Sequence, residues 1–179
     1  MKKLLLTAAA ILATLNMYGQ SGIINFANNG ATDDRRIWVG EMTTGTRAAG
    51  TGYQIALYWG NQGTPELGLV QIGGAASFLT GTAAGQFVGG NRTLTTTANG
   101  AVVTVQARAW SQIPGLPNTY EAVLSAGNAG DQRAQVGSGP VFDFKSKDPT
   151  DPQELATPIG GAAGWRGFAN TPVPEPSVI

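Results

Sequence analysis

The chain contains no cysteine and no histidine among its 179 residues. Without cysteine it can form no disulfide bond, thiol nucleophile or iron–sulfur centre, and without histidine it has no imidazole for a catalytic triad or a metal site. Charged residues make up 12% of the sequence, well below the roughly 25% of an average soluble domain. These absences exclude the commonest enzyme mechanisms, so we expect no catalytic residues, no metal site and no cofactor.

Long hydrophobic runs are also missing, apart from one near the N-terminus. Residues 4–15 carry no charge and follow Lys2 and Lys3, but a membrane-spanning helix needs about 20 apolar residues. A short apolar run behind a basic start is typical of a secretory signal peptide. We therefore expect residues 1–21 to form a signal-peptide helix recognised by the Sec machinery and signal peptidase. We expect no stable membrane span in this sequence.

Small residues indicate the cleavage site. Gly19 and Ser21 follow the small-x-small rule for cleavage before Gly22, and Met17 with Gly19 offers a weaker alternative slightly upstream. Removing the two leader lysines leaves nine basic and eleven acidic side chains. A nucleic-acid partner requires a basic surface, so we expect no such partner.

Two segments of the remaining chain alternate with the period of two that is typical of β-strands. Residues 53–59 alternate large apolar side chains with smaller or polar ones. Residues 101–110 place Arg108 and Trp110 on one predicted face and Val103 on the other. Both segments are therefore predicted strands with two different faces.

Turns rich in glycine and asparagine separate the other strand candidates. Asn99-Gly100 predicts a type I′ hairpin turn joining residues 92–97 to residues 101–110. No segment beyond the leader shows sustained helical periodicity. The weaker strand candidates are residues 23–27, 36–39, 67–72, 86–88, 92–97, 120–124 and 140–144. We predict an all-β fold, an antiparallel β-sandwich of the immunoglobulin-like or jelly-roll-like kind with about seven to nine short strands.

The predicted sandwich domain covers residues 22–145. Its core is expected to draw on these residues: Phe26, Ile55, Leu57, Phe87, Val103, Val105, Val123, Val141 or Phe142, and Phe144. Residues 146–170 begin with a charged, proline-broken stretch that is typical of a linker or an exposed extension. Within them, residues 160–168 either return one last strand through Trp165 and Phe168 or remain loose.

The last part of the chain contains the segment Val173-Pro174-Glu175-Pro176-Ser177. Following an exported β-domain, this segment resembles the start of the PEP-CTERM sorting signal of Gram-negative bacteria, so residues 171–179 are predicted to be a truncated sorting motif. The resemblance implies recognition by a membrane protease of the exosortase type. In that family a hydrophobic helix and a basic tail follow, so we expect about 20 apolar residues and then Arg or Lys to be encoded downstream of Ile179.

Parts of the body add to this resemblance. The segments that resemble PEP-CTERM proteins are residues 22–28, 53–60, 105–110 and 137–142. The resemblance implies a destination: an exported, non-enzymatic protein of the cell surface or extracellular matrix, associated with exopolysaccharide or biofilm. This is the first function hypothesis.

Aromatic side chains support a second hypothesis, a carbohydrate-binding β-sandwich module. Trp59 and Trp110 lie at predicted strand ends, and Tyr58 and Arg108 lie beside them. Flat rings stack on the apolar faces of sugars while polar neighbours bind the hydroxyls. These four residues are therefore candidate glycan-binding residues. The alternative is that both tryptophans close the ends of the core and that Arg108 packs on Trp110.

Carboxylates define a third hypothesis, a polysaccharide hydrolase, which would need two of them to converge across a glycosidic bond. The candidates are scattered along the sequence: Glu41, Glu66, Glu121, Asp131 and Asp143. Asp33-Asp34-Arg35-Arg36 is interpreted as a solvated turn with local ion pairs. Asp148, Thr150 and Asp151 lack the regular ligand spacing of a calcium loop.

Overall fold

The computed structural model describes residues 21–151 and 157–174. The predicted signal-peptide helix, and Glu175, Pro176 and Ser177 of the sorting motif, lie outside the described residues. The described chain forms ten strands, one α-helix and four short 3₁₀ helices. The strands are β1 Gly22–Ala27, β2 Ile37–Val39, β3 Thr46–Arg47, β4 Gly50–Asn61, β5 Val70–Phe78, β6 Val88–Leu94, β7 Val102–Ser111, β8 Gln135–Ser138, β9 Phe142–Lys145 and β10 Phe168–Pro172. The helices are η1 Asp33–Arg35, η2 Glu66–Gly68, η3 Gly81–Ala83, α2 Tyr120–Asn128 and η4 Ile159–Gly161.

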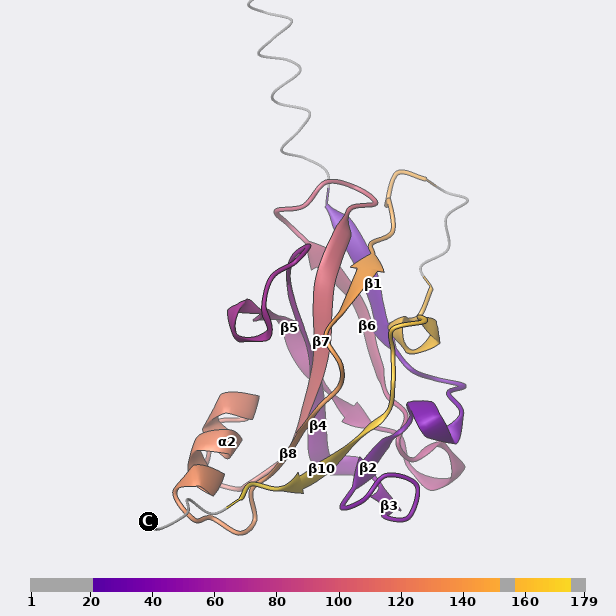
Figure 1. The fold of residues 1–179 in the computed structure, drawn as a ribbon. Coiled ribbons are helices and arrows are strands. Elements are labelled where there is room, and N and C mark those ends of the chain that lie inside the picture. The colour runs from indigo at the N-terminus through magenta and orange to yellow at the C-terminus, as the bar shows by residue number, and fades with distance from the viewer. Residues whose placement is uncertain (1–20, 152–156, 175–179) are drawn as a thin grey trace, which may run out of the picture.

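The strands form two sheets. β1 and β6 make an antiparallel pair, and the others form a sheet in the order β3-β2-β10-β8-β7-β4-β5, with β9 added to β7. In Figure 1, β1 and β6 lie on one side of β7 and α2 lies on the other. The predicted all-β, sandwich-like fold is confirmed. It is not wholly antiparallel, because β10 runs parallel to β2, and the described strands number ten, more than expected.

The main core lies where the two-stranded sheet packs on the larger one. Ile24 and Phe26 of β1 are fully buried together with Ile55 and Leu57 of β4. Burying one such side chain stabilises the fold by roughly 1.5–3 kcal/mol. Most of the predicted core is confirmed: Phe26, Ile55, Leu57, Phe87, Val103, Val105 and Val123 are buried, and Phe142 and Phe144 are partly buried against the core. Val141 is exposed.

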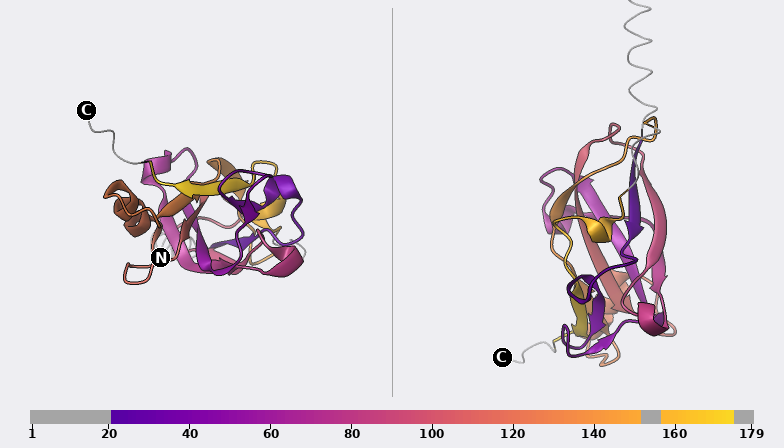
Figure 2. Two further views of the ribbon diagram at one scale, coloured as in Figure 1. Left: turned by 90° about the horizontal axis from the view of Figure 1, so that it is seen from below. Right: turned by 90° about the vertical axis from the view of Figure 1, so that its right-hand side faces the viewer.

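The opposite face of the large sheet carries a second cluster of buried hydrophobic side chains. The helix α2 covers this face (Figure 2, left). The prediction of a strand at residues 120–124 is wrong, because these residues begin α2. The Thr119 hydroxyl caps the helix by accepting a hydrogen bond from the Ala122 amide at 3.2 Å. Val123 and Gly127, one turn apart, are its buried positions. None of the helices formed by residues 21–151 and 157–174 is long and apolar enough to cross a membrane.

The loop at Asn99 and Gly100 crosses between the two sheets. β6 pairs with β1, whereas β7 pairs with β4, β8 and β9, so the predicted hairpin between the two is wrong. A type I′ turn requires a positive φ at both central residues, and of these two only Gly100 has one, at 65°. The turn residues mark a chain reversal correctly, but the strands they join belong to different layers.

The segment from η4 to β10 packs into the body. A strand returns to the sheet here, as β10, but it shares only Phe168 with the predicted range of residues 160–168, and Trp165 precedes it. Trp165 is buried in the main core, and its indole N–H donates to the Arg35 carbonyl at 2.9 Å. Closer to the domain boundary, Lys147 exchanges two backbone hydrogen bonds with Ile23 of β1.

Candidate functional site

Two of the four candidate glycan-binding residues, Tyr58 and Arg108, meet on the outer face of the large sheet. β4 and β7 are antiparallel neighbours in which Tyr58 lies opposite Gln106, and Arg108 lies two residues further along β7 on the same face. The Arg108 guanidinium carbon is 4.2 Å from the centre of the Tyr58 ring. This distance is within the range of a cation–π interaction.

Hydrogen bonds hold the Arg108 side chain in place. Its Nε donates to Gln106 Oε1 at 2.8 Å, and its Nη2 donates to the Glu66 carbonyl of η2 at 2.8 Å. The guanidinium carbon also lies 5.4 Å from the centre of the Tyr120 ring on α2. Only 11% of the side chain is exposed. Arg108 therefore links the sheet to both η2 and α2.

Two carboxylates flank this arginine. Glu121 accepts a hydrogen bond from the Tyr58 hydroxyl at 2.9 Å and lies 3.7 Å from Arg108 Nη1. Glu66 Oε1 accepts from Gln106 Nε2 at 2.7 Å. Burial and the hydrogen bond to Glu121 raise the pKa of Tyr58 well above its ordinary value, and burial also raises the pKa of Tyr120. Both phenols are therefore neutral at physiological pH.

An open cavity of about 350 Å³ lies over this cluster, between η2 and α2. Its polar lining comes from Glu66, Arg108, Tyr120 and Glu121, and its apolar lining comes from Leu67, Leu69 and Leu124. The sequence identified Glu66 and Glu121 only as scattered carboxylates. Glu121 becomes part of the site because α2 lies over β7, and the Thr119 cap was the local signal for that helix.

The two tryptophans of the glycan hypothesis lie elsewhere. Trp110 is fully buried under α2, where its indole N–H donates to Asn118 Oδ1 at 2.8 Å. Trp59 is on the other face of the sheet and packs, partly buried, against the main core. Trp110 offers no face to a sugar, and the two rings lie on opposite sides of β4 and β7. The fold therefore does not form a stacking platform from both tryptophans.

The other charged candidates hold the fold together, both within their own turns and between distant segments. Asp33 pairs with Arg36 and Arg47, while Arg35 donates to the carbonyls of Gly160 and Ala162. Asp148 accepts hydrogen bonds from Asn99 and from Thr150. Across residues 21–151 and 157–174, no group of three or more acidic side chains is placed to hold a metal ion.

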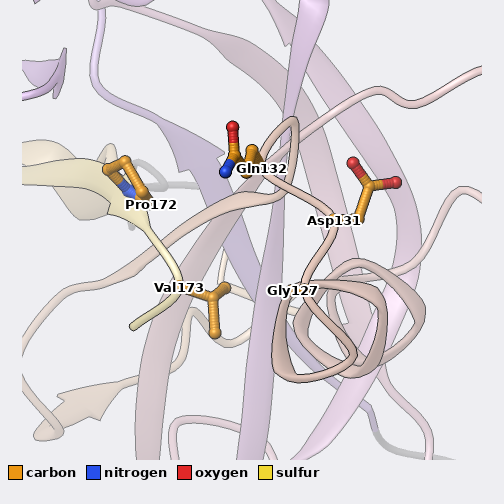
Figure 3. A pocket seen from close by; sticks show the side chains of 6 residues that line it. Gly127, Asp131, Gln132, Pro172 and Val173 are labelled. Carbon is orange, nitrogen blue, oxygen red and sulfur yellow. The ribbon is translucent and has the colours of Figure 1, made fainter. Parts of the chain in front are cut away.

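The start of the sorting motif borders a second cavity, also of about 350 Å³, between the end of α2 and β10. The Val173 amide donates to the Ala134 carbonyl at 3.2 Å, and Figure 3 shows its side chain pointing toward the helix at Gly127. Asp131 lines the same cavity and pairs with Arg133 at 2.7 Å, which lowers its pKa to about 2. Pro174 is exposed.

Comparisons with models of known protein families, with curated proteins and with solved structures find no significant match.

Proposed function

We propose that this chain is an exported, non-enzymatic protein of the cell surface or extracellular matrix of a Gram-negative bacterium. The proposal includes sorting by an exosortase-type protease and association with exopolysaccharide or biofilm. It is based on the signal-peptide pattern of residues 1–21 and on the resemblance of Val173-Pro174-Glu175-Pro176-Ser177 to a PEP-CTERM signal.

The observation that carries the proposal is the position of β10. This strand ends at Pro172, and Pro172 and Pro174 are both exposed. This end of β10 lies at the opposite end of the body from the start of β1 (Figure 1). A protease can therefore approach Pro174 without opening either sheet. The exposure of this motif residue supports the proposal.

The test follows the natural gene product in its own host. The genomic sequence after Ile179 is read first, and it should encode about 20 apolar residues followed by Arg or Lys. An immediate stop codon would contradict sorting by this route. The protein, tagged within an exposed loop, is then followed by cell fractionation and surface labelling.

Changing the motif should hold the protein in the membrane fraction. The double change Pro174→Ala and Pro176→Ala removes the motif prolines, and Pro140→Ala changes an exposed proline outside the motif as a control. We expect surface delivery to be lost in the double variant and kept in the control. Equal delivery of both variants, or a cytoplasmic location of the unchanged protein, would overturn the proposal.

A further inference from the structure

The cavity over Arg108 brings hydrogen-bond donors and acceptors together at short range. The guanidinium has five N–H donors, and its Nε and Nη2 are held by Gln106 and by the Glu66 carbonyl. The carboxylates of Glu66 and Glu121 supply acceptors on either side. A sugar hydroxyl donates one hydrogen bond and accepts others. A wall that alternates acceptor, donor and acceptor suits neighbouring hydroxyls of one sugar ring.

The rim of the cavity provides an apolar surface. Leu67, at the centre of η2, is 100% exposed, while Leu69, just after η2, is buried and lines the cavity floor. Leu124 of α2 lines the same cavity. The C–H face of a pyranose is apolar and can pack on such side chains while its hydroxyls point at polar groups. Polar groups at the base and leucines at the edge are thus both present.

The site is also preorganised. η2 is tied to β7 through two bonds, from Arg108 to the Glu66 carbonyl and from Gln106 to the Glu66 carboxylate. α2 is tied to β4 by the hydrogen bond between Tyr58 and Glu121. Binding therefore requires little further ordering of the walls, which lowers its entropic cost.

We infer that the cavity between η2 and α2 binds a neutral, hydroxyl-rich saccharide unit. A cationic ligand would meet the Arg108 guanidinium at the base, and an anionic one would meet Glu66 and Glu121. A neutral ligand uses all three groups without repulsion. The inference retains Arg108 from the glycan hypothesis as a lining residue, keeps Tyr58 only as the ring on which Arg108 stacks, and places the contact surface away from Trp59 and Trp110. It deepens the proposed function and rests on it only for the source of the polymer.

Affinity electrophoresis of the exported protein, expressed with its leader and isolated from the periplasm, tests the inference. The gels contain dextran, laminarin or galactomannan as neutral probes, and alginate as the acidic probe. Oligolysine is used as a soluble cationic competitor. We expect at least one neutral polymer to retard the protein, and alginate to have no effect. Oligolysine should not compete.

Two exposed positions are changed, and Glu121→Gln keeps an amide oxygen that can accept the hydrogen bond from the Tyr58 hydroxyl. Leu67→Ser and Glu121→Gln should each weaken the retardation at least tenfold, with an unchanged circular dichroism spectrum. The matched controls are Val88→Ser, an exposed apolar residue on β6, and Glu41→Gln, an exposed carboxylate outside the cavity. Both controls should bind like the unchanged protein.

The contrary outcomes are equally specific. No retardation by any of the three neutral polymers, or retardation that survives both Leu67→Ser and Glu121→Gln, overturns the inference. So does stronger retardation by alginate, or displacement by oligolysine. Release of reducing ends from a neutral polymer would replace it with the hydrolase hypothesis. Since binding is measured on isolated protein, its failure is separate from a failure of sorting, which is measured with Pro174→Ala and Pro176→Ala in cells.

Discussion

The Arg108 guanidinium stacks on the Tyr58 ring at 4.2 Å, and the Tyr58 hydroxyl donates to Glu121 on α2. One stacked pair thus joins two strands and the helix. Arg108→Lys keeps the charge but loses the planar fork, so we expect the free energy of unfolding to fall by about 1–3 kcal/mol. Arg133→Lys, at an exposed ion pair, should change it by less than about 0.5 kcal/mol. Urea unfolding of both variants measures the difference, and equal effects would show that the stack contributes nothing.

One buried and two partly buried tyrosines predict an unusual alkaline titration. The pKa values of Tyr53, Tyr58 and Tyr120 are all raised from 10.0, chiefly by burial. Because the fold favours the neutral phenol, its stability is complete below pH 10 and falls as the pH rises above 10, where the unfolded chain ionises first. Absorbance at 295 nm, followed together with circular dichroism, should show these three phenols ionising above pH 10 while the fold is intact. A phenolate that forms near pH 10 in protein with a native spectrum contradicts this.

The two strands predicted from alternation among neighbouring residues are confirmed, whereas the predicted pairing of β6 with β7 is wrong. The alternation of residues 53–59 and 101–110 identifies β4 and β7, and it places Ile55 and Val103 correctly in the main core. Periodicity is a local property, so it can be interpreted without knowing the partner strand. The pairing of β6 with β1 is a property of the whole chain, so the turn residues at Asn99 and Gly100 carry no information about it.

The candidate site shows the same difference between local and long-range information. Tyr58 and Arg108 could be selected from one strand pattern each, but their contact exists because β4 and β7 are neighbours. Glu121 joins them only through α2, a nine-residue helix that is too short for periodicity to identify it against a strand. The burial of Trp110 agrees with the alternative in which the tryptophans close the core, but the helix that covers it could not be predicted, since this cover lies outside its own strand.

Gly127 tests how the start of the sorting motif is attached. A Cβ built on Gly127 would lie 2.4 Å from Val173 Cβ, so Gly127→Ala should destabilise the protein by about 1–3 kcal/mol, although alanine favours helices. In a Val173→Gly background this cost should fall by at least half. Gly74→Ala, with no atom within 4 Å of its new Cβ, is the control. Thermal unfolding of the four variants measures the coupling, and additive effects would mean that Val173 does not pack there.

Trp165 tests whether the segment before β10 belongs to the core. Its ring centre is 5.9 Å from that of Phe87, and only 1% of the residue is exposed. Trp165→Ala should therefore lower the free energy of unfolding by about 3–5 kcal/mol. Val88→Ala, at a side chain that is 57% exposed, should change it by less than about 0.5 kcal/mol. Urea unfolding distinguishes the two cases, and a small effect of Trp165→Ala would indicate a detachable extension.

Asn170 of β10 is a buried polar residue whose burial is not offset by side-chain hydrogen bonds within the described residues. It is fully buried two residues after Phe168. Neither its Oδ1 nor its Nδ2 has a hydrogen-bond partner within the described part of the chain. A buried amide without a partner costs about 1–3 kcal/mol. Asn170→Val, which is similar in size and favoured in strands, should therefore raise the free energy of unfolding by about 1 kcal/mol.

Replacing Asn170 with a charged residue should have the opposite effect on the free energy of unfolding. Asn170→Asp places an unpaired carboxylate at the same buried position and should destabilise the fold by about 3–5 kcal/mol at neutral pH. The loss should shrink as the pH falls below 4, because protonation removes the charge. Asn91→Val, on the exposed part of β6, controls for strand propensity and should have an effect below about 0.5 kcal/mol. If Asn170→Val instead destabilises the protein in urea unfolding, the amide contributes hydrogen bonds to the native state, and its burial is then a stabilising feature of the strand that leads to the C-terminal motif.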